Sequence, residues 1–444
     1  MDFRTVADAV AADIASGRLR PGDRLPTQRD FARAHGIANS TATRVYAELT
    51  RRGLVVGEVG RGTYVRAASP RPFALTEPTT AAVDLELSVP AVPEQFPLLA
   101  EGMGRMLRPD VLRDALRPVG AAGTPEAREA ATGVLARAGW APDPDRVLFT
   151  GTGRQAIAAA VAALVPPGGR LGVEDLTYPA ARAIATRVGA TLVPLGIDAE
   201  GLRPDALAEA HRSARLHAVY VQPTLHNPLS VTLSYQRRLE LAQVTGALGI
   251  PIIEDAVWSH LATDPGPPLA AFAPHHTVLI DSLSKRVAPG LTLGFAVAPA
   301  SGADAVAHAI RSGAWTAPRF ALETALGWMR DGTVRSIEAA KRTDARARQA
   351  AVADLLAGFR IRTAPEASMC WWDLPEPWRA DTFVAAAARR GIAVTPGAAF
   401  AVRATAAPNA VRLGLASPPP DVLARAVATL AALARSTPDD EAIG

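Results

Sequence analysis

Apolar positions in the first 66 residues fall into short blocks that are separated by glycine-containing turns. Helical spacing joins the apolar positions of residues 3–14. Similar patterns run over residues 27–36, where Thr27 can cap the helix, and over residues 39–53, where Asn39–Ser40 can cap it. Two short apolar runs then flank a glycine-rich turn within residues 54–65. The pattern therefore predicts three helices followed by a two-stranded hairpin.

From Asp84 onward, short apolar runs alternate with alanine-rich helical patterns. Buried runs of this length, separated by helices, predict a mostly parallel α/β sheet. From about Phe359 the chain has helices and short strands of its own, which predicts a smaller α+β lobe. The predicted strands contain residues 147–149, 171–173, 191–193, 218–221, 250–253 and 278–280.

A proline-containing stretch separates the two regions. Residues 67–82 carry Pro70, Pro72 and Pro78 among small polar residues, without apolar periodicity, and would span at most roughly 50 Å. We therefore expect a small domain, a linker and a large domain with a large and a small lobe. The predicted ranges are 1–66, 67–82 and 83–436, with lobes of about 95–315 and 320–436 and a tail of 437–444.

Composition and charge limit where the protein can act and which kinds of site it can contain. The net charge is only +4, but residues 1–66 hold 11 Arg against 7 Asp plus Glu, so this region carries the whole excess. The single cysteine, Cys370, excludes internal disulfides, and we expect it to be core packing. The N-terminus does not read as a signal peptide, the longest apolar run is too short to span a bilayer, and the eight histidines lack metal-ligand spacing. We therefore expect a cytoplasmic protein without a membrane segment or a metal site.

Lysine is almost absent from this chain. Of the 47 basic residues only Lys285 and Lys341 are lysines. Arginine stays protonated, whereas a lysine can lose its proton and act as an amine nucleophile. Lys285 follows the apolar run 277–280, which suits a Schiff-base lysine that faces a cofactor. The alternative is a solvated loop lysine, and we expect Lys341, in the polar run 339–344, to be of that kind.

The residues around Lys285 resemble a known motif. Residues 282–295 read SLSKRVAPGLTLGF, which is similar to the pyridoxal 5'-phosphate (PLP) lysine segment of class I aminotransferases of fold type I. The resemblance implies PLP as cofactor and Lys285 as its Schiff-base lysine. It also implies an α/β fold type I aminotransferase-like domain with a smaller C-terminal α+β lobe.

Other positions match what a PLP site needs. Asp255 ends an apolar strand, where α/β proteins bind ligands, and resembles the acid that keeps the pyridine nitrogen protonated; the alternative is a helix-capping aspartate. Asn227, before Pro228, resembles the donor to the PLP hydroxyl, although an Asn-Pro pair alone is ordinarily a turn. Tyr178 matches the aromatic residue that stacks on the ring and would otherwise be packing. Trp258 stands where the family usually has a tyrosine, and an indole N–H donates but does not accept.

A helix N-terminus is expected to hold the cofactor phosphate. Thr152, Gly153 and Arg154 follow a strand and open a helical pattern, and Ser282 supplies a hydroxyl. The family normally has an arginine seven residues after the lysine, and this chain has Thr292. Our hypothesis is that Arg154 or Arg286 compensates for the missing charge.

The substrate end of the predicted cavity also has a candidate. Arg412, in the apolar run 410–415, resembles the arginine that grips an α-carboxylate through a bidentate pair; the alternative is a surface arginine. The family's aromatic residue from the partner subunit is expected near residues 116–120, but no tyrosine occurs there.

The N-terminal pattern is that of a winged helix-turn-helix, although it could equally be a protein-docking module. Residues 17–29, which read GRLRPGDRLPTQR, and residues 60–65, which read GRGTYV, resemble the opening signature and the wing of GntR-type DNA-binding domains. This resemblance implies a double-stranded DNA partner, with a recognition helix in the major groove. The candidate contacts are Arg29, Arg33, Ser40, Thr41, Thr43, Arg44, Arg61 and Gly62.

A GntR-type head joined to an aminotransferase-like body resembles the MocR family of PLP-dependent transcriptional regulators. This implies a homodimer that binds DNA and senses an amino compound or PLP itself. One alternative is a working aminotransferase of amino acids, which Trp258, Thr292 and the missing tyrosine disfavour because turnover needs proton transfer. A body that serves only for dimerisation is disfavoured by Lys285 and Asp255.

Overall fold

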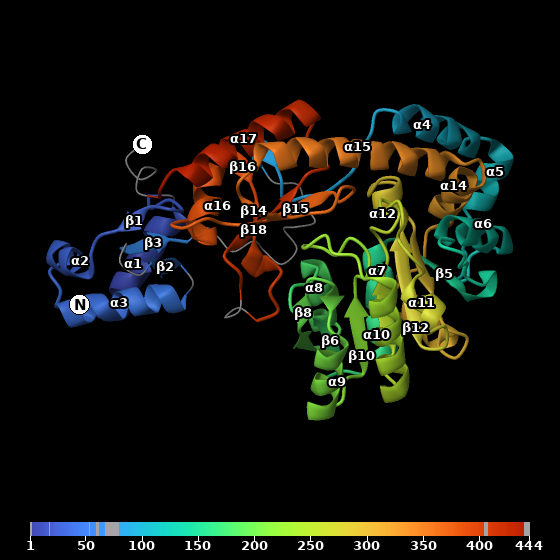
Figure 1. Ribbon diagram of the computed structural model, residues 1–444, viewed down its shortest axis with the longest axis horizontal. Coiled ribbons are helices and arrows are strands. Elements are labelled where there is room, and N and C mark those ends of the chain that lie inside the picture. Colours follow the sequence, from blue (N-terminus) through green and yellow to red (C-terminus); the bar gives the residue numbers. More distant parts are fainter. Residues whose placement is uncertain are drawn as a thin grey trace.

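The computed structural model describes residues 2–16, 18–52, 54–58, 62–66, 80–403 and 407–438. Three parts follow one another along the chain: an N-terminal head, a large lobe built on a wide sheet, and a small lobe with a sheet of its own (Figure 1). The predicted linker lies outside the described residues except for its end, 80–82. The two-domain α+β and α/β organisation expected from the sequence is confirmed.

The head has three helices and a three-stranded sheet of order β1-β3-β2. Thr27 caps the second helix, because its side chain accepts a hydrogen bond from the backbone N–H of Asp30, and Gly36 ends that helix in a left-handed conformation. The third helix has Ala38, without a capping side chain, at its N-cap, so the cap expected at Asn39–Ser40 was wrong. The elements are α1 (Phe3–Ala15), β1 (Arg24–Leu25), α2 (Gln28–His35), α3 (Asn39–Arg51), β2 (Val55–Glu58) and β3 (Gly62–Val65).

A seven-stranded sheet of order β5-β13-β12-β11-β10-β6-β7 forms the large lobe. All neighbouring strands are parallel except β13, which is antiparallel to both β12 and β5. The sequence runs predicted the six parallel strands and missed the antiparallel one. The strands are β5 (Val147–Thr150), β6 (Arg170–Glu174), β7 (Thr191–Leu195), β10 (Ala218–Val221), β11 (Ile252–Asp255), β12 (Thr277–Ser282) and β13 (Gly294–Val297), with the separate hairpin β8 (Ile197–Asp198) and β9 (Gly201–Leu202).

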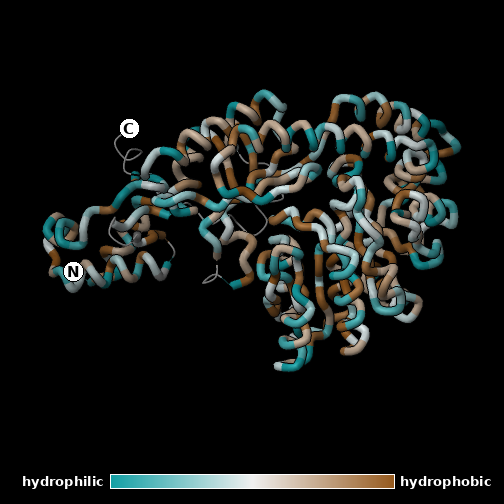
Figure 2. Tube along the Cα trace, in the orientation of Figure 1, coloured by the Kyte–Doolittle hydropathy of each residue, from teal (hydrophilic) through white to brown (hydrophobic). Residues whose placement is uncertain are grey.

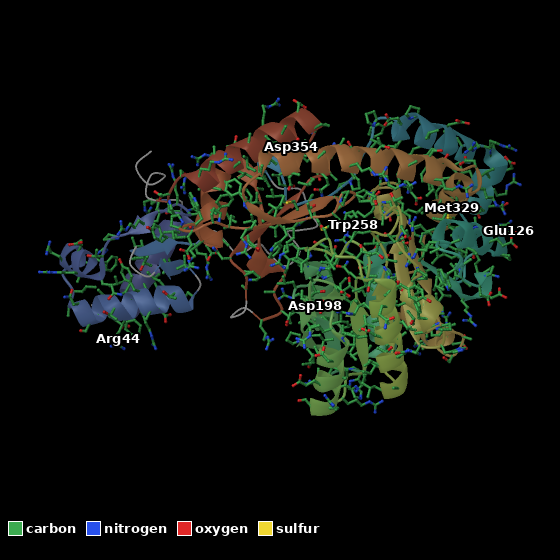
Figure 3. The ribbon with its side chains drawn as sticks, in the orientation of Figure 1. Arg44, Glu126, Asp198, Trp258, Met329 and Asp354 are labelled. Carbon is green, nitrogen blue, oxygen red and sulfur yellow. The ribbon has the colours of Figure 1, made fainter. Side chains whose placement is uncertain are left out.

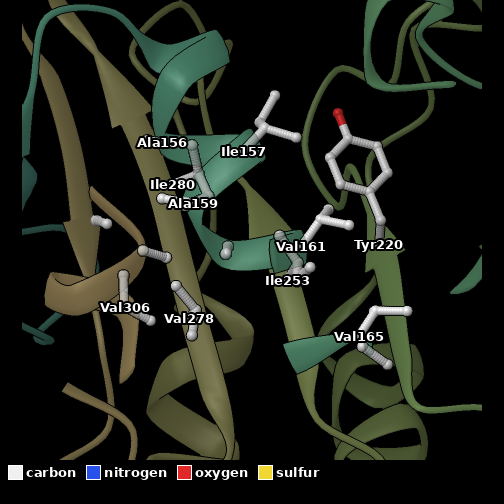
Figure 4. Packing of buried hydrophobic residues seen from close by; sticks show 14 of the residues in the cluster. Ala156, Ile157, Ala159, Val161, Val165, Tyr220, Ile253, Val278, Ile280 and Val306 are labelled. Atoms are coloured by element: carbon white, nitrogen blue, oxygen red, sulfur yellow. The ribbon is translucent and has the colours of Figure 1, made fainter. Parts of the chain in front are cut away.

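Helix α7 lies against the middle of this sheet. Its small residues allow a close approach, and Ile157, Val161 and Val165 pack with Tyr220 and Ile253 of the strands (Figure 4). Apolar stretches of the chain concentrate in the strands and on the inner sides of the helices (Figure 2). The large-lobe helices are α4 (Gln95–Met106), α5 (Pro109–Ala115), α6 (Pro125–Leu135), α7 (Gly153–Leu164), α8 (Pro179–Arg187), α9 (Pro204–Ser213), α10 (Tyr235–Leu248), α11 (Leu269–Phe272), α12 (Leu283–Arg286), α13 (Ala303–Ser312) and α14 (Arg319–Arg330).

The small lobe is an antiparallel sheet of order β14-β15-β18-β17 that packs against three helices. Cys370 lies in β15 and is fully buried in this lobe, so the expectation that it is core packing is confirmed. Strand β4, at the start of the large domain, pairs with β16 of this lobe. The elements are β4 (Val83–Asp84), α15 (Thr333–Leu355), β14 (Arg360–Arg362), β15 (Met369–Asp373), α16 (Ala380–Arg389), β16 (Ile392–Ala393), β17 (Thr395–Pro396), β18 (Ala410–Gly414) and α17 (Pro420–Arg435).

The head contacts the small lobe through polar groups. The Arg66 guanidinium lies 3.2 Å from the Asp381 carboxylate of α16, and Arg389 donates a hydrogen bond of 2.9 Å to the Pro21 carbonyl. Helix α3 contributes to neither contact. It keeps an exposed face, from which Arg44 projects (Figure 3).

Candidate PLP site and nucleic-acid interface

A cavity of about 400 Å³ lies at the carboxyl ends of β10, β11 and β12. Its other walls are the N-terminus of α7, the segment after β4, and Phe400 and Arg412 of the small lobe. Chain direction explains this position, because loops that leave parallel strands at the same edge bring their side chains together. Ten predicted site residues line the cavity: Thr152, Gly153, Arg154, Tyr178, Asn227, Asp255, Trp258, Ser282, Lys285 and Arg412.

Lys285 projects from the short helix α12 into the cavity. Its amine donates a hydrogen bond to the Ser88 carbonyl and lies 5.1 Å from the Trp258 ring centre. Burial, with smaller contributions from the charges of Arg412 and Arg154, lowers the pKa of Lys285 to about 7. A large fraction of this amine is therefore neutral near pH 7, as a nucleophilic lysine requires.

Asp255 ends β11 and is 3% exposed. Its carboxylate accepts hydrogen bonds from the Tyr220 hydroxyl (2.5 Å), the Gln222 amide (3.1 Å) and the Val257 backbone N–H (3.1 Å). Burial raises the pKa of Asp255 to about 6, although these hydrogen bonds oppose the shift. The result is an oriented acid that can pair with a cationic ring nitrogen.

Sequence reasoning missed Tyr220 and Gln222, which hold this acid. Tyr220 lies in β10 and Gln222 directly follows this strand, and both are buried, so the tyrosine hydroxyl and the amide need buried partners. Their spacing of two residues puts them on one face of a strand, next to the strand that ends in Asp255. Two polar side chains at alternate positions of an otherwise apolar run were the signal in the sequence that could have identified Tyr220 and Gln222.

Asn227 tests whether the cavity suits a polar cofactor. Its side-chain oxygen is buried and makes no hydrogen bond in the described part of the chain. A buried amide without a partner is destabilising, so a bound polar group would satisfy it. Tyr178 and Trp258 add buried aromatic surface to the same cavity, and Trp258 lies between the two lobes in Figure 3. These features fit PLP.

The N-terminus of α7 has the shape of a phosphate cradle. Thr152 is the N-cap and accepts from the Gln155 N–H at 3.2 Å. A Cβ atom on Gly153 would lie 3.0 Å from the Ser282 hydroxyl oxygen, so glycine keeps the two backbones close. Thr292 also lines the cavity, where its hydroxyl lies 2.6 Å from that of Ser284. Backbone N–H groups and hydroxyls therefore converge where an anion would bind.

The expectation that Arg286 compensates for Thr292 is wrong. The Arg286 side chain points away from the cavity and lies 2.6 Å from the Asp281 carboxylate, with a second ion pair to Glu338. Its charge is already balanced by these two buried partners. Arg154, which is exposed and lines the cavity, remains the candidate for the missing charge.

Replacing Arg154 with glutamine is expected to weaken PLP binding about tenfold, because one charge-assisted contact to the phosphate is lost. Equilibrium titration of cofactor-free protein with PLP, followed by Trp fluorescence, measures this change. Arg187→Gln is the matched control, since Arg187 is exposed at the end of α8 and does not line the cavity. Equal affinity in the two variants would show that Arg154 does not hold the phosphate.

Lys341 was also misjudged from the sequence. It is 1% exposed, and its amine donates to the backbone carbonyls of Lys285 (2.9 Å) and Val287 (2.6 Å). Burial, together with the charge of Lys285, lowers the pKa of Lys341 to about 7. Lys341 therefore fixes the end of α12 and, with it, the backbone that carries Lys285.

Arg412 lies in β18 and faces the cavity from the small lobe. It donates to the Glu86 carbonyl (2.5 Å) and to the Thr395 hydroxyl (3.3 Å). Its Nε is buried and makes no hydrogen bond among the described residues. Burial lowers the pKa of Arg412 to about 10, so the guanidinium is charged at neutral pH and available to a carboxylate.

The predicted DNA contacts lie on one part of the head. Arg29, Arg33, Ser40, Thr43 and Arg44 are exposed on α2 and α3, and Thr41 is half-buried. Arg44 stacks over Phe3, with its guanidinium carbon 4.2 Å from the ring centre. Gly62 opens β3 with a φ of +128°, which favours glycine. Arg61 lies outside the described residues.

No helix in the described part of the chain is both long enough and apolar enough to cross a bilayer. The described residues also contain no group of three or more His, Cys, Asp or Glu side chains that could hold a metal ion.

The large and small lobes have the fold of PLP-dependent aminotransferases of fold type I. Solved structures agree on the fold: an archaeal alanine:glyoxylate aminotransferase has a TM-score of 0.73 at 22% identity over 82% of this chain and 93% of that one. Kynurenine aminotransferase of Pyrococcus horikoshii has a TM-score of 0.73 at 21% identity over 80% of this chain and 91% of its own.

The family model of aminotransferase class I and II matches residues 116–430, and that of bacterial regulatory proteins, gntR family, matches residues 3–65. The chain belongs to the class I and II aminotransferase family and, with its gntR-family head, has the MocR-type domain arrangement. The cofactor of this family is PLP, in agreement with the sequence prediction.

Relatives share the whole domain arrangement. The HTH-type transcriptional regulator YdeF of Bacillus subtilis is 28% identical over 94% of this chain and 90% of its own length. The vitamin B6 salvage pathway transcriptional repressor PtsJ of Salmonella typhimurium is 27% identical over 90% of this chain and 91% of its own. The HTH-type transcriptional regulator TauR of Rhodobacter capsulatus is 27% identical over 95% of this chain and 94% of its own length.

Proposed function

We propose that this protein is a PLP-dependent transcriptional regulator, which binds DNA through its head and senses an amino compound or PLP in the cavity. The observation that carries the proposal is the presence, in one chain, of a PLP-type cavity and a winged helix-turn-helix whose α3 is exposed. The full-length relatives named as transcriptional regulators support it. A DNA-binding regulator works where the DNA is, so the proposal places the protein in the cytoplasm.

Different residues of the cavity would hold the cofactor and the effector. Lys285 would anchor PLP, Asp255 would hold its ring nitrogen, Asn227 its hydroxyl, and the N-terminus of α7 its phosphate. Bound PLP would supply an electron-withdrawing ring beside the Lys285 amine. Arg412 remains free to orient a carboxylate of the effector. An effector changes DNA binding only if it binds one conformation of the protein more tightly than another.

A working aminotransferase is the second candidate, because the cavity retains Lys285, Asp255, Asn227 and Arg412. Against it, Trp258 offers only an N–H donor where proton transfer needs a group that both gives and accepts. The two functions differ in what happens to the cofactor, which a spectrum reveals.

Amino acids added to the purified protein are expected to shift the visible absorption band of bound PLP reversibly, without formation of pyridoxamine phosphate. The Lys285→Ala variant should lack this band, because the amine that anchors the cofactor is gone. Conversion of the band to pyridoxamine phosphate, and its return on addition of a keto acid, would identify an aminotransferase instead.

Replacing Arg44 with alanine is expected to weaken DNA binding by about 1–3 kcal/mol, because an exposed arginine on the recognition helix is lost. A mobility-shift titration with the DNA upstream of the protein's own gene measures the change. Arg425→Ala, which removes a 70% exposed arginine from α17, is the control and should bind as the wild type does. Equal affinities for all three proteins would exclude Arg44 from the interface.

The proposal includes a homodimer. Large apolar side chains are exposed on the large lobe. Phe96 of α4 is 61% exposed, Leu107, which follows α4, is 74% exposed, and Leu116, which follows α5, is 76% exposed. Large exposed apolar side chains such as these are available for a protein–protein contact. A homodimer formed through the large lobe would carry two heads, which would suit a DNA site with two half-sites.

A further inference from the structure

The segment that follows β4 forms one wall of the cavity. Arg412 donates to the Glu86 carbonyl at 2.5 Å, and the Lys285 amine donates to the Ser88 carbonyl. The segment therefore lies between the guanidinium that faces the effector and the lysine that anchors the cofactor. Glu86 lines the cavity from this segment and has no part in the PLP site described above.

The charges that line the cavity can be divided between the cofactor and the effector. Arg154, Lys285 and Asp255 serve the PLP phosphate, the anchoring bond and the ring nitrogen. Asp281 is balanced by Arg286 at 2.6 Å. One cation, Arg412, and one anion, Glu86, remain for the effector. The effector that complements this remainder has both a carboxylate and a cationic group.

Both remaining groups have unused binding capacity. The Glu86 carboxylate makes no hydrogen bond or ion pair within the described ranges of the chain, and it is partly buried. Burial and the charge of Asp84 raise the pKa of Glu86 to about 7, while Arg412 opposes the shift. Arg412 has a buried Nε without a partner among the described residues. A ligand that pairs with both groups would remove these two costs.

We infer that Glu86 selects the effector, and that the effector is an α-amino acid with a second amino group on its side chain. The Arg412 guanidinium contacts the Glu86 backbone carbonyl and both residues line the cavity, so they match a carboxylate and an ammonium that are neighbours in the ligand. The α-ammonium group pairs with Glu86 and the α-carboxylate with Arg412. A second amine is then needed, because in the proposed sensing function an amino group of the effector acts at the cofactor that Lys285 anchors. This inference rests on the proposed sensing function, because it assigns the ligand of the same cavity.

The experiment is calorimetric titration of the full-length PLP-bound protein with lysine, 6-aminohexanoate and 1,5-diaminopentane. The last two lack the α-amino group and the carboxylate of lysine, respectively. We expect lysine to bind at least about tenfold more tightly than either analogue, since each analogue leaves one charge unpaired. In Glu86→Gln the advantage of lysine over 6-aminohexanoate should disappear, while the visible band of bound PLP stays.

Glu94→Gln is the control, because Glu94 is an exposed acid next to α4 and does not line the cavity; it should retain the wild-type preference. Equal binding of lysine and 6-aminohexanoate to the wild type, or an unchanged preference in Glu86→Gln, would overturn the assignment and leave the sensing function standing. Binding of none of the three compounds would overturn the assignment too. A different result would contradict the proposed sensing function itself: none of the amino acids added in the spectral experiment would shift the visible absorption band of bound PLP.

Discussion

Replacing Arg286 with methionine is expected to destabilise the protein by about 3–5 kcal/mol, because it removes the cation from a buried ion-pair cluster. Arg286 is 4% exposed, and it lies between Asp281, which is fully buried, and Glu338 of α15. Methionine keeps most of the aliphatic volume, so the main loss is electrostatic. Asp281 would then hold an uncompensated charge at the end of β12, next to the predicted phosphate cradle.

The midpoint of chemical unfolding, followed by circular dichroism, measures this loss. Arg108→Met is the matched control, because Arg108 and its partner Asp110 have side chains 69% and 62% exposed, and exposed pairs contribute about 0–1 kcal/mol. Adding Asp281→Asn to Arg286→Met should recover part of the stability, since the neutral amide has no charge to compensate. A loss as small as that of Arg108→Met would show that the cluster contributes little.

The sequence predicted those parts of the fold that depend on local pattern. The six parallel strands and the helix that opens at Gly153 follow from apolar runs and capping residues. The antiparallel direction of β13 was not predictable in this way, because a buried strand has the same composition in either direction. The pairing of β4 with β16 was missed for a related reason, since its partners lie far apart in the chain.

Motifs brought the predicted cavity residues together, but they did not reveal the partners of the charged groups. Arg286 and Lys341 both looked available from the sequence, and each is buried against the segment that carries Lys285. Which partner neutralises a charge depends on contacts between α12 and α15, 52 and 56 residues apart in the chain. Glu86 was overlooked because it follows a two-residue strand with no recognisable motif.

Helix α15 connects these observations across the molecule (Figure 1). Lys341 holds the end of α12, and further along the same helix Arg348 donates to the carbonyls of Leu415 and Pro418 in the small lobe. The small lobe in turn contacts the head through Asp381. An effector that shifts the lobes relative to each other would act on α15 first, since this helix contacts both.

Raising the pH from 7 to 9 is expected to stabilise the cofactor-free wild type relative to Lys341→Met by about 2 kcal/mol. The pKa of Lys341 falls from 10.5 in the unfolded chain to about 7 in the folded protein, because burial and the charge of Lys285 disfavour the ammonium form. Between these values the unfolded chain binds more protons, so stability rises with pH, and it is lost as the pH falls through the folded value. Methionine carries no proton, so the variant lacks this contribution.

Thermal unfolding of both proteins across this range measures the effect of Lys341 together with its coupling to Lys285 and His260, since all other titrating groups are present in both proteins. Arg335→Met, at an exposed position of α15, is the control and should follow the wild type. The absolute stability of Lys341→Met is expected to be lower at both pH values, since two buried carbonyls lose their donor. The two proteins also differ in how steeply their stability changes with pH, and this difference does not depend on the loss of the hydrogen bonds. Parallel slopes would mean that the Lys341 amine stays protonated in the folded protein, held by the carbonyls of α12 despite its burial.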